Sequence, residues 1–473
     1  MKKIYILALA CLTLGGCVDF EDDINLNPNL PTQASNTQLI ANAELALPGL
    51  SSVPQGEYFA QYLSETQYPN LSLYNQVSAS FYGLYQGPLM NLEAVLTSQN
   101  LDVKEGPVVN QLAVAKILKA YYFWHVTDRW GDVPFSEALK GREGFTPKYD
   151  TQEFIYNSLF ALLEEADKQI VVPGNITNDI IYGGDMAKWK KFGNTVRLLM
   201  ALRLSKVNPT KGQEEFNKAL TAGIMTSNAD NFVFKHLAEA ANENYWYDQI
   251  NDQRRQWWAL SNTLVDKLKP VDDPRLAVYG NKNSAGQYVG QEFGKTENLS
   301  TTSVSLLGSA IWKQDAPIYL VTFAQALFAK AEAAKIGWIS GGDAEAKTNY
   351  DLAIRNSVIQ WTVSPTYSEA NAVAAANALL AKPGVEYNPA TGYEQIAEQR
   401  WIHLFMHGFE AWAEWRRTGY PNELISPGGK AIPTRQGYPT TEEFNNTANY
   451  KEAVQRQFGG VDGLYGKVWW DKD

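Results

Sequence analysis

The sequence predicts an all-α protein built from tetratricopeptide-like helix hairpins, with long, loop-rich excursions as the expected ligand-binding regions. Three observations predict this fold class. Apolar residues recur at helical spacing over long parts of the 473-residue chain. No run shows the strict apolar–polar alternation of β-strands, and long irregular segments separate the helical stretches. With 45% hydrophobic residues, the chain has enough apolar material for a sizeable core.

The helix expected over residues 108–126 has apolar side chains around most of its surface. Val114, Ile117, Tyr121 and Trp124 follow one stripe, and a second apolar stripe lies beside it. We therefore expect other helices to enclose it. The stretch 320–338 repeats the pattern with alanines on its stripe, which allow neighbouring helices to approach closely. Further helices are expected near residues 151–169, 187–206, 213–222, 344–360 and 393–416.

Several of these helices pair with the next one across a short turn rich in Gly, Pro or Asn. Residues 318–335, followed by 343–361, have the small-residue spacing typical of degenerate tetratricopeptide hairpins, although the sequence shows no clean period. Four stretches between the helices are irregular: residues 67–85, 228–255, 274–312 and 426–470. Because such long loops in a compact protein are usually functional, we expect the binding surface there.

The first residues predict export. Lys2 and Lys3 precede an apolar run, residues 4–14, that is too short to cross a bilayer, and Gly15 and Gly16 lead into Cys17. An ordinary signal peptide that contains a cysteine is the alternative, but the Leu-Gly-Gly-Cys sequence resembles a bacterial lipobox, with Cys17 as the lipidated first residue. Cleavage would also remove Cys11, so the mature chain could form no internal disulfide and would depend on its core.

The segment after Cys17 is acidic, with carboxylates at four of the positions 18–23. It resembles the export tag that sends lipoproteins of the Bacteroidota to the outer face of the outer membrane; a solvated linker is the alternative. We expect a lipid-anchored protein of the outer membrane, exposed at the cell surface, that contacts the membrane through its lipid alone. The expected organisation is a signal peptide (residues 1–16), a lipidated linker arm (17–54) and one helical domain (55–473).

Composition excludes several function classes. The net charge of −10 disfavours a nucleic-acid partner, because such binding depends on Lys and Arg that neutralise phosphates. With four His and two Cys in the whole chain, the side chains of most metal and redox sites are scarce, and no cofactor or metal is expected. The 14 Trp and 25 Tyr are numerous for this length, so aromatic side chains are expected to dominate recognition.

A set of motifs spread over nearly the whole mature chain resembles the SusD/RagB-like nutrient-binding outer-membrane lipoproteins, and among them SusD-like group two. The motifs are residues 116–123 running into 127–135, 147–152, 182–185 before Trp189, Asn194 with 197–204, 272–276, 398–401 and 410–421. The resemblance implies an all-α body on four tetratricopeptide-like helix pairs with a ligand site on surface loops. It also implies a partner, a SusC-like TonB-dependent β-barrel that such proteins cover as a lid while they pass oligosaccharides, peptides or other nutrients into it.

The polar residues of these motifs favour architecture over catalysis. Glu410, Glu414, Arg416 and Arg417 lie among tryptophans, which favours buried Arg–carboxylate bonding rather than acid catalysis. His403 and His407 stand four residues apart on an expected helix, but no Glu lies between them, so packed core histidines are favoured over a metal site. No nucleophile elbow or phosphate-binding loop is present, and we expect no enzymatic activity.

Aromatic residues in polar loops are the best candidates for ligand contacts, because they have no core to fill. One cluster contains Tyr68, Tyr74, Tyr82 and Tyr85 among Asn70, Asn75 and Gln76; the other contains Tyr245, Trp246, Tyr247, Trp257 and Trp258 among Asn244, Asp248, Asn251 and Arg254. Tyr279, Tyr288 and Trp312 are expected to add to the same surface. The predicted ligand-binding residues are Tyr68, Asn70, Tyr74, Tyr82, Trp246, Tyr247, Arg254, Trp258 and Trp312. An alternative for Trp257 and Trp258 is that they open a helix and pack inward.

This mixture suits sugars, whose apolar ring faces stack on aromatic planes while their hydroxyls pair with polar side chains. Burying about 50 Å² per stacked ring contributes only about 1 kcal/mol, so several rings are needed and we expect millimolar to micromolar affinity. The leading hypothesis is a lipoprotein that binds an oligosaccharide or polysaccharide and delivers it to a SusC-like transporter. The alternatives are a peptide-binding member of the same family, a glycan-degrading lipoprotein enzyme, and an assembly scaffold without a small ligand.

Overall fold

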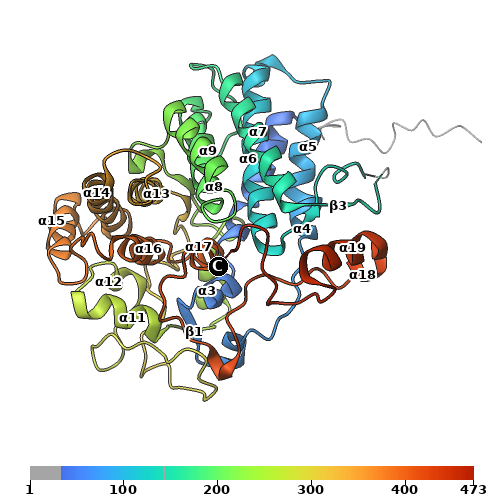
Figure 1. The fold of residues 1–473 in the computed structure, drawn as a ribbon. Coiled ribbons are helices and arrows are strands. Elements are labelled where there is room, and N and C mark those ends of the chain that lie inside the picture. Colours follow the sequence, from blue (N-terminus) through green and yellow to red (C-terminus); the bar gives the residue numbers. More distant parts are fainter. Residues whose placement is uncertain (1–33, 142–143, 473) are drawn as a thin grey trace, which may run out of the picture. The chain divides into compact units, whose positions relative to one another are not determined.

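The computed structural model describes residues 34–141 and 144–472 (Figure 1). The described part is mostly helical, with three sheets of two strands each, so the all-α prediction is confirmed. The expected signal peptide and the lipidation site Cys17 lie outside the described residues.

The longer helices are α6 (Val108–Trp130), α7 (Gln152–Gln169), α8 (Met186–Arg203), α9 (Pro209–Ala222), α13 (Phe323–Lys335), α14 (Gly342–Thr362), α15 (Glu369–Leu380), α16 (Gly392–His403), α17 (Gly408–Thr418) and α19 (Thr447–Phe458). The shorter helices are α2 (Asn36–Leu45), α3 (Pro54–Phe59), α4 (Tyr82–Leu84), α5 (Met90–Thr97), α10 (Tyr245–Tyr247), α11 (Asn262–Leu268), α12 (Leu276–Tyr279) and α18 (Glu442–Asn445). The strands are β1 (Leu63–Glu65), β2 (Val133–Pro134), β3 (Tyr149–Asp150), β4 (Phe232–Phe234), β5 (Trp258–Leu260) and β6 (Ile318–Val321).

Helices α5 to α9 stand side by side in Figure 1, and α6 packs against α5, α7 and α8. The sequence explains this arrangement. Both apolar stripes of α6 are buried, as expected of an enclosed helix. The side chain of Asp185 caps α8 by accepting hydrogen bonds from the next turn. Gly193 of α8 faces Ile117 of α6, where a Cβ would lie 3.1 Å from the Ile117 side chain, so the small residue permits the close approach of the two helices.

A second group of helices consists of α13 to α16. Thr322 and Gln325 form a capping box that starts α13. Ala326, Ala329 and Ala333 face the core shared with α8, whereas the opposite stripe of α13 packs on α14 and α15. The alanine stripe predicted from the sequence therefore lies inside the protein, and the predicted pair of helices in residues 318–361 is present as α13 and α14.

The structure differs from the predicted organisation in several places. The single helix expected over residues 393–416 is two helices, α16 and α17, because the chain turns between them and Met406 has a left-handed φ of 64°. The linker arm expected up to residue 54 ends earlier, since α2 begins at Asn36 and buries Ile40 and Ala43 against the core. The stretch 426–470, expected to be irregular, contains α18 and α19.

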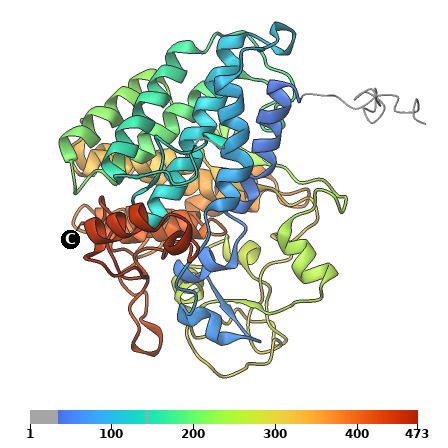
Figure 2. The ribbon, with the colours of Figure 1, turned by 90° about the vertical axis from the view of Figure 1, so that its right-hand side faces the viewer.

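The irregular segments gather beside β1 and β5 and enclose a core of their own. β1 and β5 pair antiparallel, with Leu63 opposite Leu260 and Glu65 opposite Trp258. Around this ladder, aromatic and aliphatic side chains from residues 58–63, 246–311 and 401–411 form a separate apolar cluster. Figures 1 and 2 both show these blue and yellow-green loop segments below the array of helices. None of the described helices combines the length and the apolarity that crossing a bilayer requires.

Candidate ligand-binding cleft

A cleft with a volume of about 400 Å³ lies where the two aromatic loop clusters meet. We call it the aromatic cleft. Its lining consists of Val53, Pro54, Gln55, Tyr58, Phe59, Glu65, Tyr68, Leu71, Tyr74, Asn75, Gln76, Tyr245, Gln249, Arg255, Trp257 and Trp258. The size falls within the range of small-molecule sites in proteins, and the lining combines aromatic rings with a few polar groups, as such sites do.

Trp258, Tyr58 and Glu65 form a chain of hydrogen bonds at the bottom of the aromatic cleft. The pairing of β1 with β5 places Glu65 and Trp258 next to each other. Because Glu65 stands opposite Trp258 in the ladder, their side chains share one face. Tyr58, from α3, lies between them: Trp258 Nε1 donates to the Tyr58 hydroxyl at 3.0 Å, and this hydroxyl donates to Glu65 Oε2 at 3.0 Å. Burial raises the pKa of Glu65 to about 6, although the hydrogen bond from Tyr58 opposes the shift.

The rim of the cleft carries the accessible aromatic rings. Tyr68 is 51% exposed and meets Trp257 edge to face, with ring centroids 5.0 Å apart. The Arg255 guanidinium lies 5.5 Å from the Trp257 ring and donates to Gln249 Oε1 at 2.6 Å. Asn75 and Gln76, which follow Tyr74 in the sequence, also line the cleft and are exposed. Aromatic planes and hydrogen-bonding groups therefore stand side by side at the mouth of the cleft.

A second, larger cleft of about 670 Å³ is lined by Trp246, Ala277, Val278, Phe405 and Met406, by residues 309–311, 313 and 315–319, and by residues 360–366 at the end of α14. Trp246 is 1% exposed, and its ring meets that of Trp258 edge to face at 5.2 Å. Since Trp246 lines the larger cleft and Trp258 lines the aromatic cleft, this pair lies between the two clefts.

Of the nine predicted ligand-binding residues, the structure brings three together in the aromatic cleft. These are Tyr68, Tyr74 and Trp258. Tyr68 offers an exposed ring, whereas Tyr74 and Trp258 are 4% and 5% exposed and contribute mainly to the walls. The Tyr74 hydroxyl accepts a hydrogen bond from Gln61 Nε2 at 3.0 Å, which fixes the ring in place. The alternative of a helix opened by Trp257 and Trp258 is not what the structure shows, because Trp258 belongs to β5.

The other predicted residues lie elsewhere. Tyr82 packs on the helical core and donates to Glu442, so the first cluster divides: Tyr82 and Tyr85 do not share the cleft with Tyr68. Trp246 belongs to the larger cleft. Asn70, Tyr247, Arg254 and Trp312 line neither cleft. Tyr279, expected to add to the surface, is fully buried, and its hydroxyl donates to the Ile402 carbonyl.

Among the cleft residues that sequence reasoning missed are Tyr58, Glu65 and Arg255. Tyr58 and Glu65 lie within an apolar stretch that looks like ordinary core, and the strand pairing that turns them toward Trp258 joins residues nearly 200 positions apart. Arg255 could have been predicted from the sequence, because it stands two residues before Trp257 in a polar loop.

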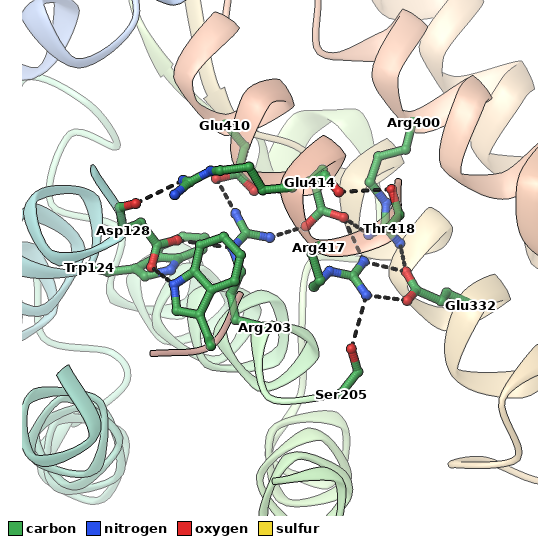
Figure 3. A network of polar contacts seen from close by, with 12 residues as sticks. Trp124, Asp128, Arg203, Ser205, Glu332, Arg400, Glu410, Glu414, Arg417 and Thr418 are labelled. Carbon is green, nitrogen blue, oxygen red and sulfur yellow. Dashed lines mark hydrogen bonds and ion pairs between the residues drawn. The ribbon is translucent and has the colours of Figure 1, made fainter. Parts of the chain in front are cut away.

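The acidic residues of the family motif form a buried ionic network (Figure 3). Arg203 Nη2 lies 2.7 Å from Glu410, and its Nε lies 3.0 Å from Asp128. Glu414 accepts from Arg203, from Arg400 at 2.6 Å and from Arg417 at 2.6 Å. Burial acts to raise the pKa of Glu414, but the three guanidiniums outweigh it and hold this pKa well below its ordinary value. The predicted buried Arg–carboxylate bonding is confirmed for Glu410, Glu414 and Arg417, whereas Arg416 donates to the carbonyls of Thr434 and Asp128.

The two histidines of the same region are packed in the core. His403 lies within hydrogen-bond distance of Thr322 Oγ1 (2.7 Å) and Ser357 Oγ (2.9 Å), and burial lowers its pKa to about 3. Among the described residues, Glu243, Asp248 and Asp252 are the one group of potential ligands close enough to share a metal ion. The Asp248 side chain already accepts hydrogen bonds from Gln249 and Gln253.

Comparisons with known proteins agree with this architecture. The model of a SusD-like family, described as "Starch-binding associating with outer membrane", matches residues 28–439. A solved chitin-binding protein is 30% identical, with a TM-score of 0.80, and covers 93% of this chain and 100% of its own. A SusD homologue from Bacteroides fragilis is 27% identical, with a TM-score of 0.79 and the same coverage. A chitin-binding SusD homologue from Flavobacterium johnsoniae is 24% identical, with a TM-score of 0.71, and covers 93% of this chain and 98% of its own. No curated protein matches the chain significantly.

Proposed function

Because the chain belongs to the SusD-like family of nutrient-binding proteins that associate with the outer membrane, we propose that it is a surface lipoprotein that binds an oligosaccharide in the aromatic cleft and does no chemistry on it. The protein then hands the sugar to a TonB-dependent transporter of the SusC type. Cys17, as the lipidated residue, anchors it to the outer membrane.

The rim of the aromatic cleft carries this proposal. Tyr68 and Trp257 present rings at the mouth of a cleft of about 400 Å³, beside the amides of Asn75, Gln76 and Gln249 and the guanidinium of Arg255. A sugar ring has apolar C–H faces and hydroxyl edges, so it can stack on the rings and pair with these polar groups at the same time.

Chitin oligosaccharides are the first ligand class that we propose. The relative that is 30% identical, and that covers 93% of this chain, is a chitin-binding protein. A β-linked chain of N-acetyl sugars offers flat ring faces to Tyr68 and Trp257, and its acetamido groups bring both a hydrogen-bond donor and a methyl group into the cleft.

A non-catalytic role agrees with the state of the carboxylates. Glu410 and Glu414 are buried and bonded to arginines of the ionic network, so they are not presented to a substrate. In the aromatic cleft Glu65 is the one carboxylate among the lining residues, whereas glycosidic hydrolysis ordinarily uses a pair.

Calorimetry of the purified mature protein with tetra-N-acetylchitotetraose tests the proposal. We expect millimolar to micromolar affinity and no release of shorter sugars. Trp257→Ala should weaken binding about fivefold, because one stacked ring contributes about 1 kcal/mol. The matched control is Tyr247→Ala, which changes an aromatic residue of the nearby helix α10 that lines neither cleft.

Two results would contradict the proposal. If Trp257→Ala and Tyr247→Ala weakened binding equally, the ligand site would not be the aromatic cleft. If the protein bound peptides and no glycan on an array, its cargo would be a peptide and not a sugar.

A further inference from the structure

Glu65 is an unusual group for the floor of an aromatic cleft. It is 2% exposed, yet Tyr58 is the one side chain of the described residues that hydrogen-bonds its carboxylate, and no Lys or Arg of residues 34–141 and 144–472 forms an ion pair with it. Buried carboxylates are normally paired, because removing the charge from water is costly.

The two oxygens of this carboxylate differ. Oε2 accepts the hydrogen bond from the Tyr58 hydroxyl. Oε1 has no protein donor in the described part of the chain, and it is not sealed in the interior as the unpaired oxygens of Glu44 and Glu57 are. Since Glu65 lines the aromatic cleft, Oε1 is an acceptor that a bound ligand can reach.

The charged and titratable groups around Glu65 indicate which charge a ligand bound at Oε1 can carry. Tyr58 of α3 hydrogen-bonds the carboxylate, and Tyr245 of α10 is close enough to Glu65, Asp248 and Arg255 for their charges to affect the pKa of its hydroxyl. An anionic sugar acid would be repelled by the negative charge of Glu65. A cationic amino sugar would be repelled by Arg255, which lines the same cleft over the Trp257 ring. A neutral ligand with an N–H or O–H donor is repelled by neither group.

We propose that Glu65 is the specificity-determining residue of the aromatic cleft, which selects N-acetylated sugars over plain sugars by accepting the acetamido N–H on Oε1. The inference rests on the proposed function. The acetamido group suits this place, because its N–H is a donor while its methyl group can pack on the rings of Tyr58, Tyr245 and Trp258 that surround the carboxylate.

If Glu65 accepts this hydrogen bond, the affinity for the N-acetylated sugar should depend on pH. The ionised carboxylate is the strong acceptor, and burial raises the pKa of Glu65 to about 6. Affinity for the N-acetylated sugar should therefore be constant above pH 7 and fall as the pH is lowered through about 6, where Glu65 takes up a proton.

The test compares two sugars of equal length that differ in the acetamido group. Calorimetry with tetra-N-acetylchitotetraose and with cellotetraose gives a ratio of affinities, which we expect to be about tenfold or more for the wild type, since a charge-assisted hydrogen bond contributes about 1.5–3 kcal/mol. Glu65→Gln keeps the shape and removes the charge, and it should lower the ratio to about twofold. Because it removes a buried unpaired charge, this variant should fold.

Glu297→Gln is the matched control, because Glu297 is an exposed carboxylate that lines neither cleft. It should leave both affinities and their ratio unchanged. The second readout is the pH profile from 5 to 8, which should lose its step near 6 in Glu65→Gln but not in Glu297→Gln.

The outcomes separate the inference from the function it rests on. An unchanged ratio in Glu65→Gln, or an equal loss for both sugars, overturns the role of Glu65 and leaves glycan binding intact. Tighter binding of the deacetylated chitosan tetramer than of the acetylated one also overturns it, because the carboxylate would then select a cation. Failure of every glycan to bind overturns the proposed function and the inference together.

Discussion

At the scale of single residues, the hydrogen-bonded chain from Trp258 through Tyr58 to Glu65 is the feature that links the fold to the proposed ligand chemistry. The Tyr58 hydroxyl accepts from Trp258 and donates to Glu65, so both of its hydrogen-bonding functions are used. Its donation favours the ionised form of Glu65 and partly offsets the effect of burial on the pKa of that carboxyl. Tyr58 is thus a positioning residue that acts through Glu65.

Tyr58→Phe tests this link. Without the donor, the pKa of Glu65 rises above about 6, so the pH at which glycan affinity is half lost should move upward. The free energy of unfolding should fall by about 1–3 kcal/mol, because Trp258 Nε1 and Glu65 Oε2 both lose a buried partner. Calorimetry from pH 5 to 8 and urea denaturation give the two readouts.

Tyr247→Phe is the control for this prediction, since Tyr247 lines neither cleft. An unchanged pH midpoint in Tyr58→Phe, together with normal binding at pH 8, would show that Glu65 does not govern the pH dependence.

Residue type and spacing predicted part of this site. Tyr68 and Trp258 stood out because polar loops give aromatic rings no core to fill, and both line the aromatic cleft. Tyr82 shared the loop of Tyr68 and the same polar neighbours, but its ring packs on the helices beside Glu442. The role of Glu65 could not be predicted from the sequence, because its surroundings depend on the strand pairing with Trp258, which the local sequence does not reveal.

At the scale of elements, the contact of α3 with α17 shows how closely two backbones approach next to the aromatic cleft. A Cβ on Gly408 would lie 2.2 Å from the carbonyl carbon of Gly56 and 2.4 Å from the backbone nitrogen of Glu57. The Gly408 N–H donates to Glu57 Oε1 at 2.9 Å. The two helices therefore require glycine at this position, and α3 supplies Tyr58 to the cleft.

We expect Gly408→Ala to lower the free energy of unfolding by about 1–3 kcal/mol or more, because the added methyl group meets backbone atoms that cannot rotate away. Displacement of α3 should also weaken glycan binding through Tyr58. Urea denaturation and calorimetry measure the two effects. In Gly49→Ala, where a Cβ would have no neighbour within 4 Å, both quantities should be unchanged; equal effects of the two substitutions would contradict this account.

Helix periodicity predicted the long helices well, since α6, α7, α8, α13 and α14 are all amphipathic or enclosed over many turns. It failed where a helix is interrupted or polar. The apolar pattern of residues 393–416 continues across the turn at Met406, so the sequence does not reveal the break. α2 contains Asn36, Thr37 and Asn42 among its apolar residues, so its composition looks like that of a linker.

At the scale of the whole molecule, the buried ionic network joins helices that are far apart in the sequence. Asp128 lies on α6, Arg203 on α8, Glu332 on α13, Arg400 on α16, and Glu414 and Arg417 on α17. Glu414 contacts three of the arginines. Each of these helices thus depends on the position of the others, so the network holds the helical array in one arrangement.

Glu414→Gln should lower the free energy of unfolding by about 3–5 kcal/mol, because it leaves buried guanidiniums without full compensation. Glu452→Gln is the control: Glu452 is exposed and pairs with Arg456 on the surface, so its loss should cost about 0–1 kcal/mol. Urea denaturation of both variants at pH 7.5 measures the difference. A similar small loss in the two variants would show that the network is not a source of stability.

We propose that the whole protein is attached to a membrane through one residue outside the described part, Cys17. Several acyl chains on one cysteine would anchor the protein firmly. Cys17→Ser should therefore move the protein from the membrane fraction to the soluble fraction and abolish labelling by radioactive palmitate, while glycan affinity stays the same. Cys11→Ser is the matched control, because Cys11 lies within the expected signal peptide and its change should leave the protein lipidated. If Cys17→Ser remained in the membrane fraction without palmitate, the attachment would come from a protein contact, and its release by loss of the transporter would identify that contact.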